Sequence, residues 1–136
     1  MLLLFAMKAA AFNKGDETMK ATNLTKEDFL TKVMDYKNNP TEWKYLGDKP
    51  AIIDFYASWC GPCQRLLPIV ESIADEFEGK VDIYKVNVDQ EEELAAAFNI
   101  RTIPTLIFIP MSGKPEREVG AKSESELRER LNNLLK

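Results

Sequence analysis

Short apolar runs of strand length alternate with helical patterns along most of this sequence, and this alternation restricts the fold more than any other feature. The runs at 51–57 and 105–110 are almost uninterrupted, as in strands that are buried on both faces of a sheet. A helix pattern, a further strand pattern at 81–88 and a short helix pattern lie between them. This order predicts one α/β domain, in which helices cover both faces of a central sheet.

The ends of the predicted helices carry capping signals. Thr25 is the expected N-cap of the first helix, with Asp28 three residues later, and Asp89 is the expected cap of the third. Ser123 and Glu126 form the pattern of a capping box at the start of the last helix. The expected helices are 24–36, 60–77, 90–99 and the one that opens at Ser123, and the remaining strands are expected within 19–24 and 113–120.

Charge and composition exclude several classes of function. The chain of 136 residues has a net charge of -4 and no basic cluster, so we expect no nucleic-acid binding. It contains no histidine, which excludes Cys-His proteases, Ser-His-Asp hydrolases and histidine-ligated metal sites.

The sequence has two cysteines, Cys60 and Cys63, in the segment WCGPC. As a structural disulfide they would close a loop too small to stabilise the fold much. As half of a metal site they would need further ligands, and in the absence of histidine only carboxylates remain. A redox pair is the interpretation that we favour, and we expect no metal.

The position of the two cysteines suits this chemistry. WCGPC directly follows the apolar run 51–57 and opens the second helix, so Cys60 is expected at a helix N-terminus, where the free N–H groups and the dipole favour a thiolate. Cys63 lies one turn later on the same face, within reach of a mixed disulfide on Cys60. Pro62 falls in the first turn, where its missing N–H has no partner to lose.

Asp54 is the one charged residue in the run 51–57. Burial should raise its pKa, so that it could take a proton from Cys63 and return it. The alternative is a buried acid with a purely structural role.

Four motifs in order resemble the thioredoxin family: DFYASWCGPC at 54–63, Pro68 within the second helix, IRTIPT at 100–105 and VGAKSESEL at 119–127. The resemblance covers 21–136 and implies the thioredoxin fold, with a central mixed β-sheet and helices on both faces. It also implies that Cys60 is the attacking cysteine and Cys63 the resolving one. The other site residues that it implies are Asp54 and Lys85, which lie close together behind the cysteines, a cis-proline loop at Ile103-Pro104, and the groove residues Trp59, Gly61, Pro62 and Gly120.

The activity that the resemblance implies is reduction of disulfides in other proteins by a reversible Cys60-Cys63 dithiol. A thioredoxin reductase or another electron donor would restore the dithiol, no bound cofactor would be needed, and the protein would be a monomer. Two alternatives are an oxidant or isomerase of the same fold and a binding module without redox chemistry. Tyr56 and Gln64 depart from the family, which usually has tryptophan and lysine there.

Residues 1–20 are predicted to be an N-terminal extension or a signal-peptide remnant, and 21–136 a single domain. The apolar run 1–12 is shorter than the about 20 residues of a membrane span, so we expect no stable membrane insertion. Ala9–Ala11 is similar to the small-residue end of a signal peptide, although Lys8 interrupts the run. An exported, periplasmic location is favoured if 1–12 end such a signal, and a cytoplasmic one otherwise.

Overall fold

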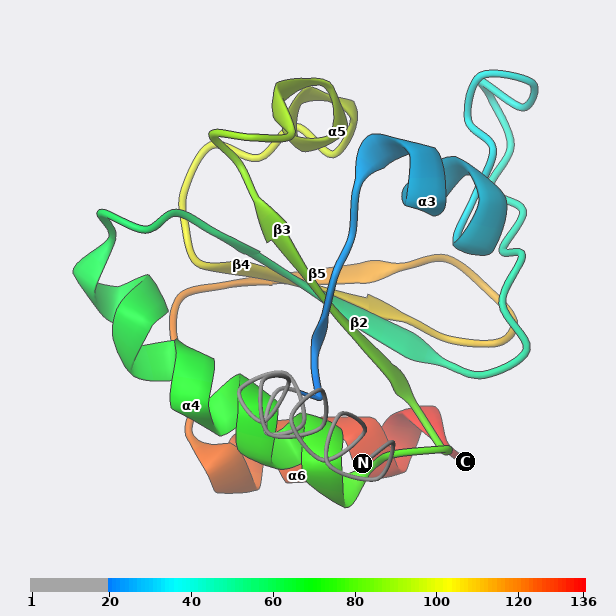
Figure 1. Cartoon of the computed structure of the whole chain (residues 1–136). Helices are drawn as coiled ribbons and strands as arrows, with labels where there is room; N and C mark the ends of the chain where they lie inside the picture. Colours follow the sequence, from blue (N-terminus) through cyan, green and yellow to red (C-terminus); the bar gives the residue numbers. More distant parts are fainter. Residues whose placement is uncertain (1–19) are drawn as a thin grey trace, which may run out of the picture.

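The computed structural model describes residues 20–136, which contain one mixed sheet of five strands in the order β1-β3-β2-β4-β5 (Figure 1). The strands β1, β3 and β2 are parallel to one another, whereas β4 is antiparallel to β2 and β5 to β4. The predicted mixed sheet is therefore confirmed. The strands are β1 (Thr22–Asn23), β2 (Ala51–Tyr56), β3 (Asp82–Asn87), β4 (Thr105–Ile109) and β5 (Glu116–Val119).

Helices cover both faces of this sheet, as predicted. Figure 1 shows α4 and α6 on one face and α3 and α5 on the other. Strands and helices follow each other along the chain in the expected order. The helices are α3 (Lys26–Lys32), α4 (Gly61–Glu76), α5 (Glu92–Ala97) and α6 (Glu124–Leu134).

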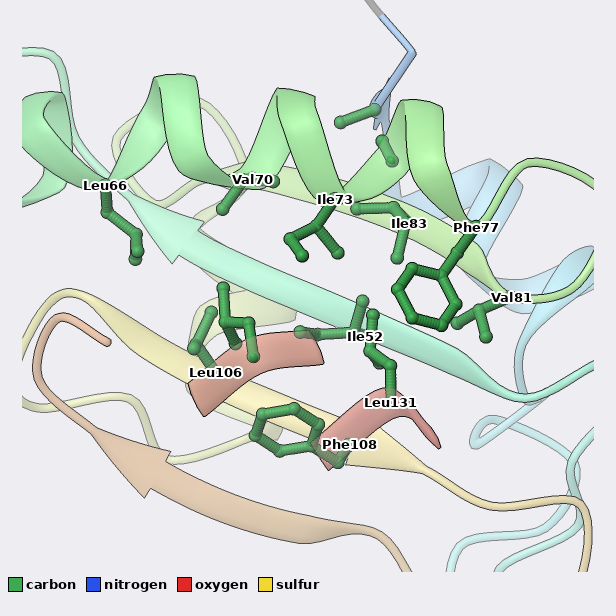
Figure 2. Packing of buried hydrophobic residues seen from close by; sticks show 13 residues of the cluster. Ile52, Leu66, Val70, Ile73, Phe77, Val81, Ile83, Leu106, Phe108 and Leu131 are labelled. Carbon is green, nitrogen blue, oxygen red and sulfur yellow. The ribbon is translucent and has the colours of Figure 1, made fainter. Parts of the chain in front are cut away.

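Two apolar layers hold the helices against the sheet. Side chains of α4 point onto the strands and toward α6, and Figure 2 shows Leu66, Val70 and Ile73 above Ile52 of β2. The second layer joins the opposite face of the sheet to α3 and α5, with Phe29 and Leu94 fully buried in it. Because side chains alternate along a strand, each residue of β2 faces one layer or the other.

This alternation places Asp54 on the face that α4 covers. Ile52 belongs to the apolar layer under α4, whereas Ile53 and Phe55 belong to the opposite layer. Lys85 of β3 is in register with Asp54. Ile83, which is two residues before Lys85 and so on the same face of β3, also lies under α4. The two charged residues therefore share the covered face of the sheet.

Three predicted helix ends can be compared with the structure. Thr25 caps α3 by accepting a hydrogen bond from the Asp28 N–H, and the capping box of Ser123 and Glu126 is present at α6. The predicted cap of α5 was wrong, because its N-cap is Glu91 and no side chain caps it. Asp89 instead accepts a hydrogen bond from another part of the chain, described below.

The first helix is shorter than the expected 24–36, since α3 ends at Lys32. The carboxylate of Asp35 accepts a hydrogen bond from the backbone N–H of Asn38 (3.2 Å), which favours a turn over further helix. Tyr36 still contacts the core, with its ring 5.8 Å from that of Phe29.

Residues 1–19, which hold nearly all of the predicted N-terminal extension, lie outside the described residues. Within 20–136, none of the helices has the length and apolar character that crossing a membrane requires. The division of the chain at residue 20 stays a prediction.

Candidate active site

Cys60 and Cys63 form a disulfide at the start of α4, with their Cα atoms 5.2 Å apart. Cys60 is the N-cap of this helix, and its Sγ accepts a hydrogen bond from the backbone N–H of Cys63 (3.2 Å). An N–H group that points at a sulfur stabilises negative charge on it, as does the positive end of the helix dipole. After reduction, the position of Cys60 therefore favours its thiolate.

The two sulfurs differ in access. Cys60 is 6% exposed and Cys63 is 1% exposed, so Cys60 is the more accessible of the two. Gly61 and Pro62 are both exposed between them. Pro62 lies in the first turn of α4, where a missing N–H breaks no helical hydrogen bond, as expected from the sequence.

Asp54 lies on β2 beneath α4 and is 1% exposed. Within residues 20–136 neither of its carboxyl oxygens has a hydrogen-bond partner. Burial raises its pKa from 3.8 to about 7, and the positive charge of Lys85 opposes this rise only in part. Asp54 can therefore bind and release a proton near neutral pH, as its place in an apolar run suggested.

Lys85 is buried beside Asp54 in the sheet but forms its ion pair elsewhere. Its Nζ lies 3.0 Å from Oε2 of Glu71 on α4. The prediction that Lys85 lies close to Asp54 agrees with the register of β2 and β3. The sequence analysis did not identify Glu71, which looks like any other polar residue of an amphipathic helix.

The loop before β4 lies against the disulfide. Cys60 Sγ is 3.9 Å from the carbonyl oxygen of Ile103, and the peptide bond between Ile103 and Pro104 is cis, as the resemblance implied. Gly120 donates its N–H to the carbonyl oxygen of Pro104 (2.8 Å). It does so with a φ of 98°, a conformation that favours glycine.

These residues do not all reach the surface. Trp59 is 71% exposed and Pro62 is exposed, whereas Ile103 is half-buried. Pro104, the proline of the expected cis-proline loop, is buried and therefore does not contribute to the exposed surface beside Cys60.

The exposed indole of Trp59 is held in place by a residue that the sequence analysis assigned to another role. Its Nε1 donates a hydrogen bond to Oδ2 of Asp89 (2.8 Å), which lies in the turn after β3. A large apolar side chain fixed beside a disulfide offers a contact surface with little conformational entropy to lose on binding.

Comparison with known proteins agrees with this geometry. The family model described as Thioredoxin matches residues 20–133. The chain belongs to the thioredoxin family. Among its relatives, a thioredoxin of Borreliella burgdorferi is 50% identical over 104 residues, which cover 76% of this chain and 88% of that protein. A chloroplastic M-type thioredoxin of Spinacia oleracea is 35% identical over 100 residues, which cover 71% of this chain and 55% of that protein.

A solved structure supports the same assignment. The crystal structure of chloroplastic thioredoxin z aligns with a TM-score of 0.68 and 25% identity, over 85% of this chain and 95% of that one. With its Cys60-Cys63 pair, the protein is a thiol–disulfide oxidoreductase of the thioredoxin type, that is, a disulfide reductase. Thioredoxins act on disulfide substrates together with reductase partners.

One departure from the usual thioredoxin pattern has a structural consequence. Gln64, at a position where the family usually has lysine, donates a hydrogen bond from Nε2 to the carbonyl oxygen of Ser58 (3.2 Å). The side chain thereby connects the first turn of α4 to the loop that carries Trp59. A charge near the cysteines is replaced by a contact that supports the loop.

Proposed function

We propose that this thioredoxin reduces disulfides of other proteins by attack of Cys60, with Cys63 as the resolving cysteine and Asp54 as the base. The observation that supports these roles best is the difference between the two sulfurs. Cys60 caps α4 and is the more exposed, whereas Cys63 is buried one turn inside.

The reaction proceeds in two exchanges. The Cys60 thiolate attacks one sulfur of the substrate disulfide, forms a mixed disulfide, and releases the other substrate sulfur as a thiolate. Asp54 then takes the proton of the Cys63 thiol, and the Cys63 thiolate attacks Sγ of Cys60. The second substrate thiolate leaves, and Cys60-Cys63 remains oxidised.

Two electrons and two protons must then return to the Cys60-Cys63 disulfide. A thioredoxin reductase is the electron donor that we propose, since the family works with reductase partners. We also propose supporting roles for Lys85, Trp59, Gly61, Pro62 and Gly120. Lys85 adjusts the proton affinity of Asp54, and the others shape the surface around Cys60.

Alkylation of the reduced protein tests the assignment of the nucleophile. At neutral pH, Cys60 is expected to react with iodoacetamide much faster than Cys63, because it is more exposed and its thiolate is favoured by the helix N-terminus. Peptide mapping after brief exposure measures both rates. Faster modification of Cys63 would reverse the two roles.

Substrate recognition is expected at the surface around Ile103. An extended segment of a substrate can lie beside this loop and form main-chain hydrogen bonds there, so that recognition depends little on sequence. Ile103→Lys places a charge in this apolar surface. We expect it to slow reduction of the insulin disulfides by about tenfold or more, a loss of about 1.4 kcal/mol or more.

A small disulfide reagent provides the comparison for this variant. Reduction of a reagent such as dithiobis(nitrobenzoate) should change little, because the reagent reaches Cys60 without occupying the groove. Met111→Lys is the matched control, since it puts the same charge on an exposed apolar residue at the opposite end of β4. An equal loss of both activities in Ile103→Lys would place recognition elsewhere.

A further inference from the structure

The carboxylate of Glu71 connects three parts of the chain beneath the active site. Its Oε2 lies 3.0 Å from Nζ of Lys85 on β3. Its Oε1 accepts hydrogen bonds from the backbone N–H groups of Lys20 (2.7 Å) and Ala21 (3.0 Å), just before β1. Glu71 itself is on α4, about two turns after Cys63.

The ion pair between Glu71 and Lys85 is largely removed from solvent, with side-chain exposures of 17% and 5%. Over the described part of the chain, Glu71 is the one carboxylate within 4.0 Å of the Lys85 ammonium. Asp54 is the register neighbour of Lys85 on the same face, yet no such pair forms between them. The buried ammonium is thus bound to α4 and not to the active-site acid.

We propose that Glu71 is a positioning residue for the proton transfer at Asp54: it binds the Lys85 ammonium and keeps that charge from pairing with the acid. Asp54 then remains free to accept the proton of Cys63. This inference rests on the proposed proton transfer between those two residues.

Lys85 of β3 is the charged group that acts on Asp54, and it lies in register with the acid. The helix α4, which covers this face of the sheet, carries Cys63, held in the disulfide, and Glu71, paired with Lys85. β4 presents Leu106 opposite Asp54, and α6 contributes leucines to the same apolar layer. Burial is the largest influence on the pKa of Asp54 and raises it to about 7, whereas Lys85 lowers it, so an ammonium closer to Asp54 would lower this pKa further.

Glu71→Gln separates the charge of this residue from its hydrogen bonds. The amide keeps an oxygen that can accept from Lys20 and Ala21, but it cannot neutralise Lys85. The buried ammonium then has Asp54 as its neighbouring carboxylate, which lowers the pKa of Asp54. Loss of the negative charge on α4 lowers this pKa as well. We expect the titration midpoint of Asp54 to fall by about one pH unit.

The measurement is a ¹³C NMR titration of the Asp54 carboxyl in the oxidised protein, where the disulfide-bonded cysteines do not titrate. The acid limb of the pH–rate profile for insulin reduction should move in the same direction. Glu76→Gln is the matched control: it removes one negative charge from the same helix, at a surface pair with Arg128, and should leave the midpoint unchanged.

A double-mutant cycle separates action through Lys85 from a direct effect of the Glu71 charge. In a Lys85→Met background, Glu71→Gln should shift the Asp54 midpoint much less than in the wild-type background. Glu71→Asp keeps the charge and is expected to return the midpoint most of the way to the wild-type value. If Glu71→Gln folds poorly, Glu71→Ala in the same two backgrounds tests the same point, since it also removes the carboxylate that pairs with Lys85.

Each outcome distinguishes this inference from the proposed function. An Asp54 midpoint that is unchanged or raised in Glu71→Gln would overturn the role of Glu71 and leave the proton transfer intact. An equal shift with and without Lys85 would also overturn it. An Asp54 that does not titrate between about pH 5 and pH 9 in the wild-type protein would overturn the proton transfer and the role of Glu71 together.

Discussion

At pH 8 the oxidised Asp54→Asn variant is expected to be more stable than the wild-type protein by about 4 kcal/mol. The pKa of Asp54 rises from 3.8 in the unfolded chain to about 7 in the folded protein, and one pKa unit corresponds to about 1.36 kcal/mol. Asp54 is 1% exposed, so solvent does little to reduce the penalty on its charge. Asparagine has nearly the same shape but carries no charge, so its burial does not incur this desolvation cost.

The advantage of the variant should depend on pH with a defined sign. Between about pH 4 and pH 7 the unfolded chain has released the Asp54 proton while the folded protein retains it, so wild-type stability falls as the pH rises. The two proteins should be similar at pH 4 and differ fully above pH 7. Urea unfolding at several pH values measures this, and an advantage that stays constant across the range would contradict it.

The same variant should be slower as a reductase. Asparagine cannot accept the proton of Cys63, so we expect turnover at pH 7 to fall by about tenfold or more, even though the fold is stabilised. Equal turnover of variant and wild type at each pH would reduce Asp54 to a structural residue. The combination of greater stability and lower activity is the result that a purely structural acid would not give.

Cys63→Ser is expected to abolish turnover and to trap substrate proteins as mixed disulfides on Cys60. The first exchange needs only Cys60, but release of the substrate needs the second thiolate. Non-reducing electrophoresis of the variant with oxidised insulin measures the trapped species.

Cys60→Ser is the control for this experiment, because it leaves the buried Cys63 as the one thiol. It should be inactive and should trap little, since Cys63 is 1% exposed. Trapping by Cys60→Ser at the level of Cys63→Ser would show that the buried cysteine can act as the nucleophile.

The parts of this protein that sequence analysis predicted depend on local patterns. The strand runs, the helix at 60–77 and the capping box at Ser123 each involve residues close together in the chain, where periodicity and side-chain chemistry suffice. The environment of Asp54 was predictable for a related reason, since a single charge in a buried strand must be desolvated.

The parts that it missed depend on where distant segments meet. Glu71 pairs with Lys85 because α4 crosses β3, and Asp89 binds Trp59 because the turn after β3 lies beside the start of α4. The residues next to Glu71 and Asp89 in the sequence do not distinguish either of them from an ordinary solvent-exposed acid. The end of α3 was missed because the Asp35 turn competes with a helix pattern that continues to Tyr36.

The greater exposure of Cys60 has a consequence for the proposed cycle. If Cys60 forms both mixed disulfides, the electron donor and the substrate protein react at the same residue, one after the other. Each turnover would then consist of two separate encounters, as in a ping-pong mechanism. The protein would work as a shuttle, and a high concentration of either partner would delay the other by occupying Cys60.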